Sequence, residues 1–157
     1  MTDRTIVGLL HPGEMGAAVG RCLTGSGYTV LWASQGRGPA TAQRAIAAGL
    51  TDAGTVADLA AEAGIILSVC PPHAARDVAA AVAGYAGVFV DANAISPQTT
   101  REVAAIVGNG AGYVDGGIIG APPEPGPPGR TRLYLSGERA AEVRDLFGGA
   151  RDGADTQ

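Results

Sequence analysis

The stretch TIVGLLHPGEMGAAVG, residues 5–20, decides the fold of this chain. It begins as an apolar run over residues 5–10, which is typical of a buried parallel strand. It ends in small residues over 13–19, which suit a helix packed closely on a sheet. The turn between the two is His11-Pro12-Gly13. Free N–H groups at such a helix start, together with the positive end of the helix dipole, predict a binding site for a pyrophosphate.

This turn departs at one position from the dinucleotide-binding fingerprint G-x-G-x-x-G. His11 occupies the first glycine position, whereas Gly13 and Gly16 occupy the other two. Because the chain holds 25 glycines, the flanking strand and helix, and not the spacing alone, favour a phosphate-binding turn over a plain βα turn. Pro12 has no N–H, so the donors are expected to follow it. The predicted cofactor-binding residues of the turn are His11, Pro12, Gly13, Glu14 and Met15.

The segment GLLHPGEMG, residues 8–16, resembles the opening of the β-hydroxyacid dehydrogenases and 6-phosphogluconate dehydrogenases, whose turn ends in G-x-M-G. Its His-Pro version resembles a less characterised, imine-reductase-like branch of that superfamily. Three later segments match in the same order: CPP at 70–72, VDANAISP at 90–97 and VDGGIIG at 114–120. The resemblance covers about residues 4–148. It implies a Rossmann NAD(P)-binding domain without the helical C-terminal domain of the family.

Short apolar runs alternate with helical patterns along the rest of the chain. We expect further strands at 28–32, 65–70, 88–91, 112–115 and 131–136, and at most a short one between 49 and 54. Helices are expected at 15–24, 41–48, 56–62, 74–83, 98–107 and 138–147. This alternation predicts an α/β fold with a doubly wound, mostly parallel sheet.

The length of 157 residues fits one domain, which we expect over residues 1–148, followed by a polar tail over 149–157 that is predicted to be disordered. No apolar run reaches 18 residues and the first four residues do not begin a signal peptide, so a cytoplasmic protein without membrane contact is expected. Cys22 and Cys70 suit buried thiols better than a metal site or a disulfide.

The net charge of −4 argues against nucleic acid as a partner, because a phosphate backbone requires a basic face. All eleven basic residues are arginines, and the chain contains no lysine. The missing lysine limits the proton-transfer chemistry that the chain can perform.

The loop over residues 33–39 follows the second predicted strand, where a doubly wound fold places the acid that binds the 2′-hydroxyl of NAD. No acidic residue occurs between Glu14 and Asp52. Ser34 and Arg37 offer a hydroxyl and a guanidinium that suit a 2′-phosphate. The loop therefore favours NADP over NAD, and a solvated arginine in a polar loop remains the alternative.

The ends of the central strands should line the ligand crevice of such a sheet. The resemblance implies that Asn93 lies near the nicotinamide ribose, whereas Asp91 is expected to support the loop. His73 could be functional, although a structural role at a helix start is the more common one. The CPP segment adds three predicted cofactor-binding residues, Cys70, Pro71 and Pro72.

The segment over 116–120 resembles the one in which the family positions substrate against the cofactor. The predicted substrate-side residues are Gly117, Ile119 and Gly120. Ile119 stands where many relatives have serine, which weakens the expectation of hydroxyl recognition. The following loop, residues 121–129, holds five prolines and is either a lid or a surface detour.

The resemblance implies hydride transfer between NADP(H) and a small carbonyl, hydroxy-acid or imine substrate. Relatives carry a helical second domain with a lysine, or another polar group, for proton transfer, and nothing in this sequence corresponds to it. We therefore expect an NADP-dependent oxidoreductase whose helical half is missing or supplied by another chain, as a homo-oligomer or with a helical partner. No catalytic residue is assigned. A non-catalytic NADP-binding sensor or degenerate module is the alternative, and an interaction protein the least favoured one.

Overall fold

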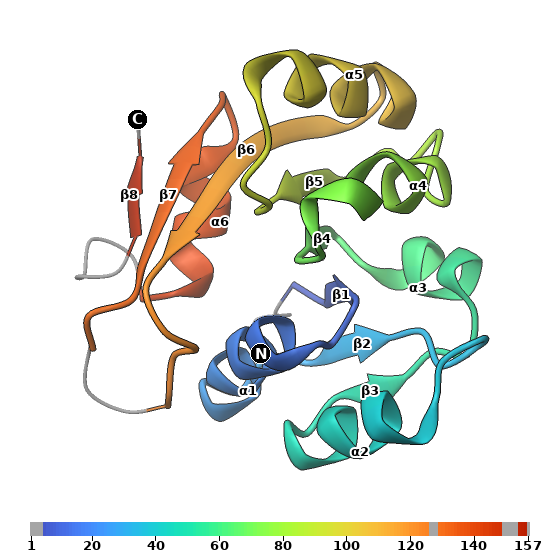
Figure 1. The fold of residues 1–157 in the computed structure, drawn as a ribbon, viewed down its shortest axis with the longest axis vertical. Helices are drawn as coiled ribbons and strands as arrows, with labels where there is room; N and C mark the ends of the chain where they lie inside the picture. Colours follow the sequence, from blue (N-terminus) through green and yellow to red (C-terminus); the bar gives the residue numbers. More distant parts are fainter. Residues whose placement is uncertain (1–4, 126–128, 149–153, 157) are drawn as a thin grey trace.

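The computed structural model describes residues 5–125, 129–148 and 154–156. These residues form an eight-stranded sheet in the order β3-β2-β1-β4-β5-β6-β7-β8 (Figure 1). Neighbouring strands are parallel except for β6 and β7, which are antiparallel. The strands are β1 (Val7–Leu10), β2 (Val30–Trp32), β3 (Thr51–Asp52), β4 (Ile65–Ser68), β5 (Val88–Asp91), β6 (Gly112–Ile119), β7 (Arg132–Ser136) and β8 (Ala154–Thr156).

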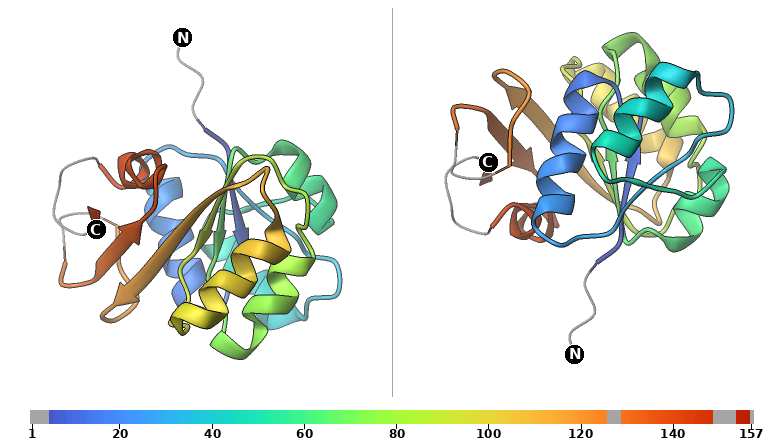
Figure 2. Two further views of the ribbon diagram at one scale, coloured as in Figure 1. Left: turned by 90° about the horizontal axis from the view of Figure 1, so that it is seen from above. Right: turned by 90° about the horizontal axis from the view of Figure 1, so that it is seen from below.

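Helices cover both faces of the sheet (Figures 1 and 2). They are α1 (Glu14–Gly25), α2 (Pro39–Ala47), α3 (Val56–Glu62), the 3-10 turn η1 (Pro72–Ala74), α4 (Ala75–Ala80), α5 (Pro97–Val107) and α6 (Ala140–Leu146). Apolar side chains of α1 and α6 pack on one face, and those of α3, α4 and α5 pack on the other. Because the central strands are buried on both faces, they consist of short and nearly continuous apolar runs.

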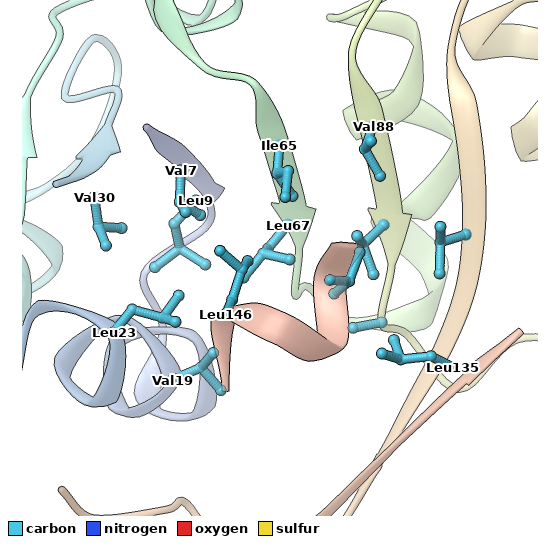
Figure 3. Packing of buried hydrophobic residues seen from close by; sticks show 14 of the residues in the cluster. Val7, Leu9, Val19, Leu23, Val30, Ile65, Leu67, Val88, Leu135 and Leu146 are labelled. Atoms are coloured by element: carbon cyan, nitrogen blue, oxygen red, sulfur yellow. The ribbon is translucent and has the colours of Figure 1, made fainter. Parts of the chain in front are cut away.

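The two faces of β1 illustrate how the sequence specifies this packing. Val7 and Leu9 point into the cluster that α1 and α6 cover, together with Leu67 of β4 and Leu23 of α1 (Figure 3). On the opposite face, a Cβ on Gly8 would lie within 2.4 Å of Leu59 Cδ2 of α3. Glycine at this position therefore lets α3 approach the centre of the sheet closely.

The structure confirms the doubly wound, mostly parallel sheet and corrects several element boundaries. β2 begins at Val30 rather than at residue 28, and β4 ends at Ser68 rather than at residue 70. β6 continues to Ile119, so the predicted strand at 112–115 is only its first half, because β7 supplies an antiparallel partner for the second half. The helix predicted over 74–83 is a 3-10 turn followed by α4, which ends at Ala80. The last helix begins at Ala140 rather than at residue 138.

Within the segment 149–157, predicted to be a polar tail, the structure describes residues 154–156 as β8, which pairs with β7 in parallel. Backbone hydrogen bonding to the exposed edge of β7 accounts for this strand. Residues 149–153 and 157, and part of the proline-rich loop, residues 126–128, lie outside the described residues.

Candidate functional site

The turn between β1 and α1 has a backbone conformation that explains its sequence. His11 has φ = 67°, in the left-handed region that residues other than glycine rarely enter. It is the one non-glycine residue with positive φ among the residues that the structure describes. The first glycine of the fingerprint is therefore replaced here by a histidine that keeps a glycine-like conformation. Gly13 N donates a hydrogen bond to His11 O at 2.8 Å and closes the turn.

The two remaining fingerprint glycines have different functions in this structure. A Cβ on Gly16 would lie 2.5 Å from His11 O and 3.7 Å from Val69 Cβ, so glycine lets α1 lie against the turn and the end of β4. A Cβ on Gly13 would meet no described atom within 4 Å. Gly13 is also the N-cap of α1 and provides no side-chain cap. The start of α1 therefore has open space at Gly13 and no side-chain cap, which leaves room for an anion to approach.

Two arginines contact this turn from the loop after β2 and from α2. The Arg37 guanidinium lies 3.4 Å from His11 Nε2. Arg44 Nε donates to Pro12 O at 3.2 Å. Burial, and then the Arg37 charge, lower the pKa of His11, so Nε2 of its neutral ring can accept a hydrogen bond from the Arg37 guanidinium. Arg37 thus lies beside the turn, and its role toward a 2′-phosphate stays a prediction. Arg44, to which the sequence analysis assigned no role, also contacts the turn.

The loop after β2 contains a contact that the sequence analysis missed. Asp52 Oδ1 accepts hydrogen bonds from Ser34 N at 3.3 Å and from Gly54 N at 2.8 Å. Bonding to the Ser34 side chain and to Gly54 N lowers the pKa of Asp52, so this exposed carboxyl is ionised near neutral pH. Because β3 runs parallel to β2, with Trp32 paired to Asp52, the carboxylate reaches the same edge of the sheet. The 33–39 loop itself lacks an acid, but β3 supplies one.

The ends of β4 and β5 are joined by Asn93, which is buried, with 4% of its surface exposed. Its Oδ1 accepts from Cys70 N at 2.6 Å, and its Nδ2 donates to Ser68 Oγ at 3.3 Å. Asn93 therefore fixes the strand ends at the centre of the crevice, and its placement near a nicotinamide ribose stays a prediction. Cys70 is a free, half-buried thiol whose pKa is raised chiefly by burial.

Asp91 lies behind this junction and is almost fully buried. It accepts hydrogen bonds from Asn93 N at 3.0 Å and from the Tyr113 hydroxyl at 3.4 Å. Burial raises the pKa of Asp91, and the neighbouring Asp115 charge raises it further. These bonds give Asp91 the loop-supporting role expected from the sequence.

A depression with a volume of about 270 Å³ opens beside these strand ends. Its lining residues are Asn93, Ala94, Ile95, Asp115, Gly116, Gly117, Tyr134, Leu135 and Ser136. Of the predicted substrate-side residues, Gly117 lies in this lining, whereas Ile119 and Gly120 lie at the end of β6 and just beyond it. Ile119 is 64% exposed, which is unusual for a large apolar side chain.

Five other residues named in the sequence analysis are placed at the same edge of the sheet. Pro71 and Pro72 follow β4 and are exposed, and Pro72 begins η1. His73, also on η1, is exposed. Met15 and Glu14 form the first turn of α1, and Met15 packs against the core.

In the described part of the chain, no three His, Cys, Asp or Glu side chains group in a way that could hold a metal ion. Nor does any described helix have the length and apolar character needed to span a membrane.

A model of the NAD-binding domain of 6-phosphogluconate dehydrogenase matches residues 5–131. A search of curated proteins found no significant match to the chain. Among solved structures, the chain is similar to MTH1747, a conserved protein of unknown function that has structural similarity to 3-hydroxyacid dehydrogenases. The two share 27% identity at a TM-score of 0.83, over 97% of this chain and 57% of that one.

Two further solved structures share the fold at lower identity. The Mycobacterium tuberculosis 3-hydroxyisobutyrate dehydrogenase shares 22% identity at a TM-score of 0.76, over 98% of this chain and 54% of that one. An imine reductase from Pseudomonas sp. shares 19% identity at a TM-score of 0.76, over 99% of this chain and 55% of that one. The present chain thus spans little more than half the length of these proteins.

Proposed function

This chain belongs to the family of the NAD-binding domain of 6-phosphogluconate dehydrogenase, and from that premise we propose that it binds NADP(H) at the carboxyl edge of its sheet. The observation that carries the proposal is the open space at Gly13, at the start of an uncapped helix with Arg37 beside it. The first N–H groups of α1 would hold the pyrophosphate. Ser34 and Arg37 would hold the 2′-phosphate, because a guanidinium pairs with phosphate through charge-assisted hydrogen bonds.

We further propose that the bound cofactor exchanges a hydride with a small carbonyl, hydroxy-acid or imine substrate. The nicotinamide supplies that chemistry, and the protein orients it. Asn93 would keep the ends of β4 and β5 aligned under the reacting ring, since it bonds to both. Structures similar to this chain include a reductive aminase from Aspergillus terreus in complex with NADPH, which supports the NADP assignment. The imine reductase from Pseudomonas sp. supports the imine assignment.

The proton-transfer group is proposed to come from a helical domain outside the described residues, in the same polypeptide or another. Two observations support this assignment: the chain contains no lysine, and it spans about half the length of the similar structures. We also propose that the chain associates with itself or with a helical partner, binds a small-molecule substrate and is located in the cytoplasm.

Titration of the purified chain with NADPH and NADH tests the cofactor assignment. We expect tighter binding of NADPH, and we expect Arg37→Ala to weaken NADPH selectively by about 1–3 kcal/mol, the value of a charge-assisted contact. Arg101→Ala is the matched control. It removes the same charge as Arg37→Ala, but from α5, a helix that contains none of the residues proposed to bind the cofactor. Equal affinity for the two cofactors, or a preference for NADH, would contradict the NADP assignment.

A non-catalytic NADP-binding module is the second candidate, and the exposed Ile119 favours it. The isoleucine side chain has no polar atom, so it cannot hydrogen-bond a substrate hydroxyl. One measurement separates the oxidoreductase from the non-catalytic module. The full-length polypeptide is assayed for oxidation of NADPH with small aldehydes, keto acids and cyclic imines as substrates. Binding without turnover of any of these substrate classes supports the module.

A further inference from the structure

We propose that Asp52 is a specificity-determining residue of the cofactor site, which positions the loop after β2 and limits its preference for a 2′-phosphate over a 2′-hydroxyl. The inference rests on the proposed function, because it concerns the same cofactor. It adds a residue from β3, a strand to which dinucleotide-binding motifs assign no part.

The positioning role follows from the hydrogen bonds of the Asp52 carboxylate. A single oxygen, Oδ1, accepts from Ser34 N in the loop after β2 and from Gly54 N just after β3. A backbone bond from Gln35 N to Gly54 O, at 3.0 Å, runs alongside. Arg37 N donates to Ser34 O at 2.9 Å and closes the turn that carries the guanidinium. The position of Arg37 therefore depends on Ser34, and that of Ser34 depends on Asp52.

The effect on specificity follows from the charge of the same group. Asp52 is exposed and ionised, and at the end of β3 it accepts a hydrogen bond from Ser34, one of the two residues proposed to bind the 2′-phosphate. A carboxylate accepts a hydrogen bond from a ribose hydroxyl but repels a phosphate dianion. Arg37 has the opposite preference. Asp52 on β3 and Arg37 in the loop after β2 therefore act against each other. The net preference for a 2′-phosphate over a 2′-hydroxyl is smaller than Arg37 alone would give.

The bonding pattern also supplies a variant that separates the two roles. Asp52→Asn keeps a carbonyl oxygen that can accept from both N–H groups, but it removes the charge. We expect this variant to increase the ratio of NADPH affinity to NADH affinity by about five- to twentyfold. Asp52→Ala removes the acceptor as well. It should weaken both cofactors, because Ser34 and Arg37 are then no longer held in place.

Dissociation constants for NADPH and NADH, measured by fluorescence titration of the full chain and its variants, test the proposal. The same comparison of affinities is then made with 2′,5′-ADP and 5′-AMP, which lack the nicotinamide half of the cofactors. Glu62→Gln is the matched control, since Glu62 is an exposed acid at the end of α3, just before β4 begins and therefore at the amino edge of the sheet. We expect the ratio to be unchanged in this variant.

An NADPH to NADH ratio that stays constant or falls in Asp52→Asn would overturn the role of Asp52 in specificity, while binding by the unsubstituted chain leaves the proposed function intact. An equal change in Glu62→Gln would also overturn it, because the effect would then come from net charge. If the unsubstituted chain binds neither cofactor, the proposed function fails and this inference fails with it.

Discussion

Valine substitutions at the two fingerprint glycines should have opposite consequences. At Gly13, a Cβ meets no described atom within 4 Å, and the backbone at φ −73° and ψ −165° is extended, a conformation that valine adopts readily. Gly13→Val should therefore change the free energy of unfolding by less than about 1 kcal/mol, the cost of a poorer N-cap. The added side chain would occupy the space in front of the helix start. Binding of NADPH should then be lost.

At Gly16 the same substitution acts on the fold. The new Cβ would lie 2.5 Å from His11 O, and its methyl groups would be added on a helix that already approaches Val69. Overpacking of this kind costs about 3 kcal/mol. The better helix propensity of valine relative to glycine offsets only roughly 0.5 kcal/mol of this cost. We therefore expect Gly16→Val to lower the free energy of unfolding by about 2–3 kcal/mol, and the melting temperature by roughly 4–12 °C.

Thermal unfolding followed by circular dichroism, without cofactor, measures the stability of both variants. Fluorescence titration with NADPH, at a temperature at which both variants are folded, measures their cofactor binding. Normal NADPH binding by Gly13→Val would show that the dinucleotide is not seated at this turn. Unchanged stability of Gly16→Val would show that α1 can move away from the turn, and the argument from close approach would be wrong.

Two further predictions concern the turn and the whole chain. Because His11 has a left-handed backbone conformation, His11→Val should lower the free energy of unfolding by about 1–2 kcal/mol, whereas His11→Gly should not, and the reverse order in urea denaturation would contradict this. The native pKa of His11 lies below its ordinary value of 6.5, so stability should fall as the pH drops below that value, and His11→Gly should remove this part of the pH dependence. Finally, the isolated chain should self-associate through apolar surface that includes Ile46 and Ile119, and should reduce aldehydes, keto acids and imines poorly; a monomer in sedimentation with ordinary turnover would refute this.

The sequence was sufficient to predict the sheet because each central strand is a short apolar run bounded by turn residues. The runs at 65–70 and 88–91 are of this kind, and the structure has buried parallel strands over Ile65–Ser68 and Val88–Asp91. The length of β6 was not predictable in the same way. Its second half begins with Gly116 and Gly117, which have low strand propensity, and the strand continues through them in pairing with β7.

The predicted site shows the same division between local and long-range information. A motif reports residues that are neighbours along the chain, so it located the His11–Gly13 turn and Arg37. It could not report Arg44, which reaches Pro12 O from α2, or Asp52, which reaches Ser34 N from β3. Parallel pairing brings the carboxyl ends of β2 and β3 together, with Trp32 opposite Asp52. The absence of an acid after one strand is therefore weak evidence about cofactor choice until the ends of the neighbouring strands have been considered.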